Sequence, residues 1–398
     1  MTREKTYRRF RPGEIEPYWY AIVLFLLAGA TLYVRHLATG QTPDRVAFSI
    51  DALNISVYWY GILITTGILL GAYVVSRLAR DRARDVLRDT VPGEVRQRPV
   101  NALGLPAELR DLVHKQGIET LGDLLLPWGF GREELRLNEE GASVLRERLE
   151  AHASVKREWI DDPPWARWDP AHVWSGVIWA LIFAVVGARL YHVLTPPPSM
   201  AELGIESPMD YFRHPLQLIN VRRGGLGIYG GIAGGALGLL IYSYRQRISA
   251  LGWADLGVVG VALGQFVGRW GNFFNQELYG RPTDVPWALH IEPAYRLDGY
   301  TQFERFHPAF LYESLWNLFA FLILLTLARR YKDRLQTGDL TAAYLILYAV
   351  GRTLLEQVRL DSATLGLFGI DVGMSVATAV SLLIAIAMGS WLLYRHVV

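Results

Sequence analysis

The 398-residue sequence contains no cysteine. This absence excludes disulfide bonds, thiolate zinc sites, iron–sulfur clusters and a cysteine nucleophile supplied by the protein itself. Charged residues make up only 20% of the chain, below the fraction of about 25% that is usual in soluble proteins. The formal net charge is +2, so the chain as a whole does not attract polyanions. Any sulfur chemistry would therefore use a sulfur atom of the substrate.

Long apolar stretches are abundant instead. About 20 helical residues cross a hydrocarbon core about 30 Å thick. Eight stretches fit that length, namely 17–36, 57–79, 171–195, 226–246, 251–274, 307–328, 338–358 and 372–394. The first follows the basic segment MTREKTYRRFR but is longer than the apolar region of a signal peptide, with no A-x-A cleavage site after it. We interpret it as an uncleaved signal anchor and predict an all-α polytopic membrane protein with about eight transmembrane helices.

Lysine and arginine gather in alternate connections between these stretches. Basic clusters occupy 1–16 and follow the second, fourth and sixth stretches as SRLARDRARD, YRQR and ARRYKDR. The opposite connections hold scattered arginines and one pair, Arg222 and Arg223. Because basic loops face the cytoplasm, this bias predicts that both termini are cytoplasmic.

A polar insert separates the second and third stretches. Residues 80–160 carry 14 basic and 15 acidic residues, and their glycine breaks predict short amphipathic helices. The insert resembles a helix-hairpin-helix module such as the C-terminal domain of the RNA polymerase α-subunit, but its balanced charge argues against nucleic-acid binding. We expect a small cytoplasmic domain that contacts a protein partner, which the sequence does not identify, or that stabilises the chain. The predicted organisation is an extra span and loop at 1–56, a core span at 57–79, the insert at 80–170, and further core spans at 171–398 with outer-face loops 196–225 and 275–306.

Four sets of polar residues lie within or beside the apolar stretches. An ionisable side chain inside a transmembrane helix is costly and generally faces a cavity or a partner. The sets are Arg269, Asn272, Asn275, Glu277 and Arg281; Tyr348, Arg352, Glu356 and Arg359; Arg189 and Tyr191; and His307, Tyr312 and Glu313. The second set follows one helical stripe.

These sets share one depth. At 1.5 Å per residue, Arg269 and Arg189 lie about 27 Å above the cytoplasmic start of their spans, and Arg352 lies about 21 Å above its own. Tyr60, His307 and the segment GGLGIYGG at 224–231 begin spans from the outer side. The common level predicts one shared site in the outer leaflet.

Each set also has a structural explanation of its own. Arg352 and Glu356 would form an internal ion pair, and Arg189 would reach the lipid headgroups. The glycines of 224–231 would serve helix packing, the asparagines would bond between helices, and His307 would begin a helix. The shared depth favours a functional site. Because arginine binds phosphate in bidentate fashion and carboxamides suit glycerol or ester oxygens, we predict an enzyme or carrier acting on an anionic phospholipid.

At this point a family resemblance is visible. The segment GRWGNFFNQELYGR at 268–281 resembles the signature of bacterial prolipoprotein diacylglyceryl transferases. Supporting matches in the same order are VYWYGI at 57–62, GARLY at 187–191, GGLGIYGG at 224–231, HPAFLYE at 307–313 and YAVGRTLLEQVR at 348–359. The resemblance covers 57–79 and 171–395. It implies a seven-helix family core, to which the first span and the insert are additions.

The resemblance implies a reaction in the bacterial cytoplasmic (inner) membrane, at its outer-leaflet side. Family members transfer the diacylglyceryl group of phosphatidylglycerol to the thiol of the lipobox cysteine of a prolipoprotein; a thioether forms and glycerol phosphate leaves. It further implies that Arg269 and Asn272 bind the lipid headgroup, that Glu277 and Gly280 shape the site, and that Tyr60, Arg352 and Glu356 are needed for activity. We add Asn275, Arg189, His307 and Tyr348 as substrate-binding candidates. Besides these substrates and the surrounding membrane lipids, no metal, cofactor or nucleic acid is expected.

One position departs from part of the family. Many members have a histidine, proposed as the base, where this chain has Tyr229, and a tyrosine with a pKa near 10 is a poor base at neutral pH. Three options stay open. Tyr229 binds lipid while the arginines lower the pKa of the substrate thiol, or His307 or Glu277 accepts the proton, or the chain is an impaired paralogue. The alternative from another class is a non-enzymatic phospholipid binder or transporter.

Overall fold

A computed structural model describes residues 15–50, 52, 55–196, 200–201, 204–213, 215, 218, 227–360, 364–367 and 370–397. The N-terminal basic cluster up to residue 14, the pair Arg222 and Arg223, and the first three residues of GGLGIYGG lie outside the described residues. The chain forms two compact units. The first comprises Met1–Val74 and Gly257–Val398, and the second comprises Val75–Leu256.

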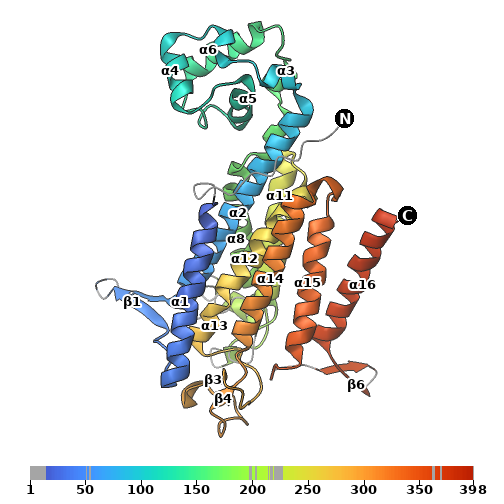
Figure 1. Cartoon of the computed structure of the whole chain (residues 1–398). Helices are drawn as coiled ribbons and strands as arrows, with labels where there is room; N and C mark the ends of the chain where they lie inside the picture. Colours follow the sequence, from blue (N-terminus) through green and yellow to red (C-terminus); the bar gives the residue numbers. More distant parts are fainter. Residues whose placement is uncertain are drawn as a thin grey trace. The chain divides into compact units, whose positions relative to one another are not determined.

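The first unit is a set of long helices joined by short antiparallel hairpins (Figure 1). Its elements are α1 (Pro17–Thr39), β1 (Val46–Ile50), β2 (Ile55–Tyr58), the start of α2 (Trp59–Thr90), the end of α12 (Ala250–Gly268), α13 (Trp270–Asn275), β3 (Leu289–His290), η6 (Pro293–Tyr295), β4 (Arg305–Phe306), α14 (Ala309–Arg330), η7 (Lys332–Arg334), α15 (Asp339–Glu356), β5 (Thr364–Leu367), β6 (Ile370–Ser375) and α16 (Val376–Val397). The strand pairs are β1 with β2, β3 with β4, and β5 with β6. The helices therefore make up the body of the unit, and the strands lie in its connections.

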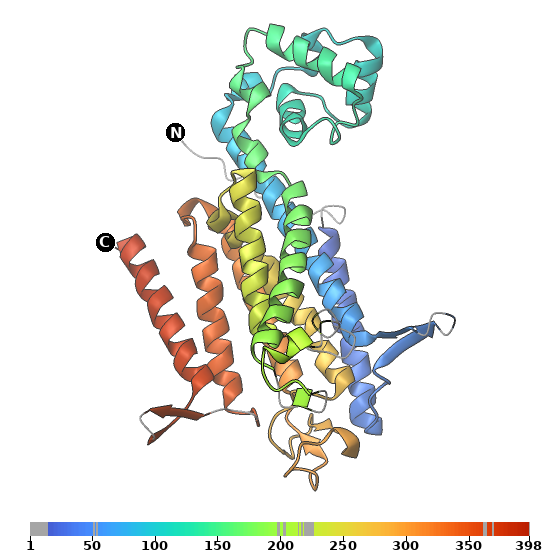
Figure 2. The ribbon, with the colours of Figure 1, turned by 180° about the vertical axis from the view of Figure 1, so that it is seen from behind.

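The second unit combines a helix pair with a cluster of short helices (Figure 2). After the end of α2, its elements are α3 (Gly93–Arg96), η3 (Val100–Leu103), α4 (Ala107–Lys115), α5 (Leu121–Phe130), α6 (Glu139–Ala151), α7 (Glu158–Asp161), η4 (Pro164–Trp168), α8 (Ala171–Leu194), α9 (Asp210–Arg213), α11 (Ile228–Gln246) and the start of α12. Helices α8 and α11 lie side by side because glycines let their backbones meet. A Cβ at Gly187 would lie 2.3 Å from the carbonyl oxygen of Gly230.

The short helices of the second unit have a hydrophobic core of their own. Leu121, Leu124 and Leu125 on α5 are fully buried, together with Trp159 and Trp165. A capping box begins α5, because the Thr120 hydroxyl accepts the Asp123 N–H while the Asp123 carboxylate accepts the Thr120 N–H. Helix α2 continues without a break to Thr90 before these helices begin. The proposed division of the chain at residue 80 stays a prediction.

Helices occupy all eight predicted apolar stretches, with α12 and α13 together covering the fifth. Six helices in the described part of the chain are long and apolar enough to cross a membrane, namely Pro17–Thr39, Trp59–Thr90, Ala171–Leu194, Ala250–Asn275, Ala309–Arg330 and Val376–Val397. Helices α11 and α15 fall outside this set. Both are long enough, but the glycines and polar residues of α11 and the charged residues Asp339, Arg352 and Glu356 of α15 lower their mean hydropathy. The prediction of an all-α polytopic membrane fold is confirmed.

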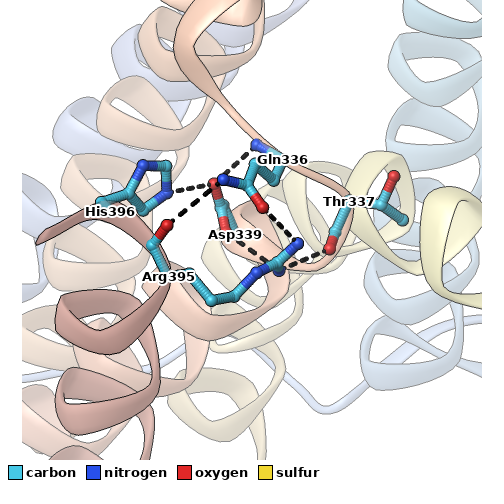
Figure 3. Close-up of polar contacts among 5 residues, drawn as sticks. All are labelled: Gln336, Thr337, Asp339, Arg395 and His396. Carbon is cyan, nitrogen blue, oxygen red and sulfur yellow. Dashed lines mark hydrogen bonds and ion pairs between the residues drawn. The ribbon is translucent and has the colours of Figure 1, made fainter. Parts of the chain in front are cut away.

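A buried carboxylate links one end of α15 to one end of α16, the last two helices of the chain (Figure 3). Asp339, the first residue of α15, is 2% exposed. It accepts the Gln336 N–H at 2.6 Å and lies 2.8 Å from His396 Nε2 and 3.4 Å from Arg395 Nη1. Arg395 also donates to the Thr337 carbonyl oxygen at 2.8 Å. These contacts join the end of α16 to the beginning of α15, the helix that carries Arg352 and Glu356.

Helices α2 and α12 approach each other through glycine within the first unit, and this contact gives a test of the packing. A Cβ at Gly71 would lie 2.5 Å from the carbonyl oxygen of Gly260. We expect Gly71→Ala to lower the thermal unfolding midpoint in detergent by several degrees, since overpacking costs about 1–3 kcal/mol. The matched control is Gly389→Ala on α16, where nothing lies within 4 Å of the added Cβ. Equal midpoints for the two variants would contradict the packing.

Candidate functional site

A buried glutamate joins two arginines of the sequence motifs. Glu313, in the second turn of α14, is 6% exposed. Its Oε2 lies 2.5 Å from Nε of Arg269, and its Oε1 lies 3.5 Å from Nη1 of Arg359. Arg269 stands at the junction of α12 and α13, and Arg359 follows the last turn of α15. One carboxylate thus contacts two guanidiniums, which are groups that bind phosphate in bidentate fashion.

A second ion pair lies along α15. Arg352 Nη2 is 2.9 Å from Glu356 Oε2, at the i,i+4 spacing of one helix face. Glu356 is 8% exposed. Arg352 Nη1 and Glu356 Oε1 are buried and have no hydrogen-bond partner within the described ranges. An unsatisfied buried polar atom is costly. A bound ligand that accepted a hydrogen bond from Arg352 Nη1 and donated one to Glu356 Oε1 would remove that cost.

The loop after α13 is held by its own amide side chains. Asn272 Nδ2 donates to Glu277 Oε1 at 2.9 Å, and Asn275 Nδ2 donates to the same oxygen at 3.2 Å. Gln276 and Leu278, on either side of Glu277, have φ values of 52° and 53°. Non-glycine residues adopt this left-handed conformation at an energetic cost, usually where the surrounding structure enforces it. The strained backbone turns the Glu277 carboxylate back toward the two asparagines.

Backbone hydrogen bonds join three segments next to this loop. The Gly280 N–H donates to the His307 carbonyl at 2.9 Å, the His307 N–H to the Arg281 carbonyl at 3.0 Å, and the Arg281 N–H to the Val358 carbonyl at 2.7 Å. A Cβ at Gly280 would lie 2.6 Å from the Val358 oxygen. Glycine is therefore required for the close approach of the backbones. This contact brings the end of α13, the beginning of α14 and the end of α15 together.

His307 and Tyr348 take different places in the unit. His307 Nδ1 lies 3.2 Å from the hydroxyl of Tyr312, which also accepts a hydrogen bond from Trp287 Nε1 at 2.9 Å. Tyr348 is 43% exposed on α15, with its ring centroid 6.3 Å from that of Tyr344. No hydrogen bond of Tyr348 is found within the described residues.

A cavity of about 1060 Å³ adjoins the loop after α13. Three of the predicted site residues line it, namely Tyr60, Asn275 and Glu277. The remaining lining residues are Arg45, Ser56, Val57, Tyr58, Gly61, Gln276, Leu278, Tyr279, Tyr295, Leu297 and Leu360. The Tyr279 hydroxyl donates to the Tyr295 carbonyl and accepts the Leu297 N–H, and burial raises the pKa of Tyr279. The cavity wall therefore combines aromatic rings with one carboxylate, one arginine and amide groups.

Two predicted site residues belong to the second unit. Arg189 Nε, on α8, donates to the Leu218 carbonyl at 2.8 Å, and its guanidinium lies 5.9 Å from the Tyr211 ring centroid. Tyr229, in the first turn of α11, is 69% exposed, and its ring centroid is 5.8 Å from that of Tyr191. Because Arg269 belongs to the first unit, a site that it shares with these residues stays a prediction.

Glu313 and Arg359 belong to the predicted polar sets, but the sequence motifs assigned neither of them a role in the site. Both were visible in HPAFLYES and YAVGRTLLEQVR. Glutamate near the start of a predicted span and arginine near the end of another gave no sign that they would pair. The signal available was charge complementarity, since Arg269 had no acidic partner one helical turn away in its own segment.

Comparison with known protein families decides the classification. The family model of prolipoprotein diacylglyceryl transferase matches residues 149–394, more than half of the chain. This chain belongs to that family. The matched range contains all the predicted site residues except Tyr60, and it leaves out α1. The chain is accordingly a multi-pass membrane protein, and the predicted family is confirmed.

Several curated relatives carry the name phosphatidylglycerol–prolipoprotein diacylglyceryl transferase. The Frankia alni protein is 46% identical over 196 residues, which are 49% of this chain and 48% of that protein. The Thermosynechococcus vestitus protein is 40% identical over 227 residues, 57% of this chain and 78% of the relative. A Streptomyces coelicolor protein, number 2 of that name, is 43% identical over 208 residues, 52% of this chain and 62% of the relative. The match thus spans about half the length of the Frankia relative and about three quarters of the Thermosynechococcus one.

The ion pairs at Glu313 give a stability prediction. We expect Glu313→Gln to lower the thermal unfolding midpoint in detergent clearly, because removing one partner of a buried ion pair costs about 3–5 kcal/mol. The variant keeps the size of the side chain and removes only its charge. Glu304→Gln is the matched control, since Glu304 is exposed. If both variants unfolded at the wild-type temperature, Glu313 would not hold Arg269 and Arg359 as described.

Proposed function

We propose that this protein transfers the diacylglyceryl group of phosphatidylglycerol to the thiol of the lipobox cysteine of a prolipoprotein. The family membership and the names of the relatives support this activity. One observation carries the proposal, namely where the structure places the family motif at 268–281. This motif supplies Arg269, which pairs with Glu313, and it supplies Asn275 and Glu277 to the cavity wall.

The reaction needs positive charge at the leaving group. The substrate sulfur attacks the terminal glyceryl carbon of the lipid, a carbon–sulfur bond forms, and the bond from that carbon to the phosphate oxygen breaks. Glycerol phosphate leaves with the electron pair, so negative charge grows on its oxygen. Preorganised donors aimed at developing charge give electrostatic stabilisation, which usually contributes more to catalysis than any other effect. We assign this role to Arg269 and Arg352.

The other site residues then take supporting roles. Asn272 binds the lipid headgroup, and Glu277 and Gly280 fix the shape of the loop. Tyr60 and Asn275 contact substrate in the cavity that they line. Glu356 orients Arg352 through their ion pair of 2.9 Å. The substrate-binding set is completed by His307, Tyr348 and Arg189.

The substrate thiol must lose its proton to react. A free thiol has a pKa of about 8.5, and a nearby positive charge lowers it. We propose that the arginines provide this field, while Tyr229 contacts lipid and takes no part in proton transfer. The exposed position of Tyr229 on α11 supports a lipid contact.

The basic loops support a topology with both termini in the cytoplasm. We place the enzyme in the bacterial inner membrane, with its site on the outer-leaflet side. The helices within 80–170 then form a cytoplasmic domain. Their own hydrophobic core supports a separate folding unit, for which we propose protein contact or stabilisation.

A direct assay tests the activity. The purified protein in detergent is mixed with phosphatidylglycerol and a lipobox peptide, and the peptide mass is followed by mass spectrometry. We expect a mass gain equal to one diacylglyceryl group, and we expect Arg269→Ala to reduce its rate at least about 100-fold, since loss of one preorganised donor costs that much. Arg84→Ala is the matched control, because the Arg84 guanidinium pairs with Asp81 on the same helix and belongs to none of the proposed site residues.

The outcomes separate the two function classes. Formation of the thioether peptide by the wild type but not by Arg269→Ala supports the transferase. A folded wild-type protein that binds phosphatidylglycerol vesicles and never modifies the peptide would contradict it and indicate a non-enzymatic lipid binder.

The role of Tyr229 has its own test. We expect Tyr229→Phe to keep the wild-type rate within about twofold between about pH 6 and pH 9, because the variant keeps the aromatic ring and loses only a hydroxyl that takes no part in proton transfer. The measurement is the same mass-spectrometric rate at each pH. A rate that falls more than about tenfold in Tyr229→Phe, with unchanged folding, would assign the proton transfer to Tyr229.

A further inference from the structure

Helix α1 packs against α13, the helix that follows Arg269. Helix α1 lies outside the family match. A Cβ at Gly29 would lie 2.7 Å from the ring of Trp270, so this ring fits over the glycine. Phe25 meets the same ring edge to face, with centroids 6.0 Å apart. At the other end of α1, the Tyr18 hydroxyl accepts a hydrogen bond of 2.9 Å from Arg329 on α14. Helix α1 is therefore an integral part of the first unit rather than only an anchor.

The last turns of α1 hold two buried polar side chains. Tyr33 is 7% exposed and His36 is 1% exposed. The Tyr33 hydroxyl donates to the Trp287 carbonyl at 2.8 Å. His36 Nε2 lies 3.0 Å from the backbone nitrogen of His290, and its Nδ1 lies 3.1 Å from the Gln41 carbonyl oxygen.

These partners fix the protonation of His36. A backbone N–H can only donate, so Nε2 of His36 must accept and carry no proton. A carbonyl oxygen can only accept, so Nδ1 of His36 carries the proton. The ring is thus a neutral imidazole with one tautomer, and it joins α1 to the strand β3.

The segment that His36 holds contributes to the cavity. His290 pairs with Arg305 between β3 and β4, and Tyr295 and Leu297, further along the same segment, line the cavity wall. Gln276, next to Glu277, exchanges two hydrogen bonds with Glu292, of 2.9 Å and 2.8 Å. The position of β3 therefore sets both the cavity wall and the loop that carries Glu277.

We propose that His36 is a positioning residue for the transfer reaction, which holds the segment 287–297 in place at the cavity. The predicted changes in KM and kcat rest on the proposed function, whereas the structural role of His36 does not. The segment lines the cavity, whereas Arg269, Glu313 and Arg352 are not among its lining residues. Loosening the segment should therefore weaken binding of the substrate in the cavity more than it slows the chemical step.

Two variants isolate the acceptor atom of His36. His36→Phe keeps an aromatic ring beside Phe273 and removes the acceptor, whereas His36→Gln keeps an acceptor near the position of Nε2 and removes the ring. We expect His36→Phe to speed hydrogen–deuterium exchange of the amides at 288–292 at least about 10-fold, because the His290 N–H loses its acceptor. We also expect it to raise KM for the lipobox peptide several-fold with kcat within about twofold. His36→Gln should restore both values close to the wild type.

Thr31→Val is the matched control on the same helix, because Thr31 is exposed and its hydroxyl donates to the Leu27 carbonyl of its own helix. Exchange at 288–292 that equals the wild type in folded His36→Phe would overturn the proposal. An equal loss of kcat in both His36 variants would also overturn it, since that pattern indicates general destabilisation. A wild-type protein without transfer activity overturns the proposed function, and the exchange rates then still decide whether His36 holds the segment.

Discussion

The candidate site depends on a single buried carboxylate. Glu313 lies within ion-pair distance of both Arg269 and Arg359, which come from different segments. Two guanidiniums would repel each other if they were brought together in a poorly solvated site without an anion. The carboxylate offsets this repulsion and holds the two guanidiniums near each other. Guanidiniums are the side-chain groups that bind phosphate in bidentate fashion.

Backbone contacts also hold the segments of the candidate site together. Gly280 allows the strand-like contact with His307 and Val358, so the loop after α13 lies directly beside the start of α14 and the end of α15. The left-handed conformations of Gln276 and Leu278 then aim Glu277 at the asparagines. Preorganisation of this kind lowers the reorganisation needed during reaction. The energetic cost of the strained turn is offset by the hydrogen bonds on either side of it.

Segments outside the family match also support the site. Gly29 of α1 packs against the ring of Trp270, and His36 of α1 accepts a hydrogen bond from the His290 N–H of β3. Tyr60, on α2, lines the cavity, and its ring lies over Gly271. Arg269 and Arg359 belong to the matched part of the chain, whereas part of the cavity wall comes from residues that precede the match, such as Tyr60.

The sequence by itself determined the all-α membrane architecture, because apolar runs of fixed length depend only on composition and spacing. It also determined the family, because the motif at 268–281 is long. Tertiary structure alone decided which charges of distant segments pair. Arg352 and Glu356 are one helical turn apart and could be paired from spacing, but Glu313 lies 44 positions after Arg269 and 46 before Arg359. Ion pairs between distant segments follow from helix packing, which no local pattern encodes. His36 is the same case, since its partner is the backbone N–H of His290 and a backbone group leaves no trace in residue identity.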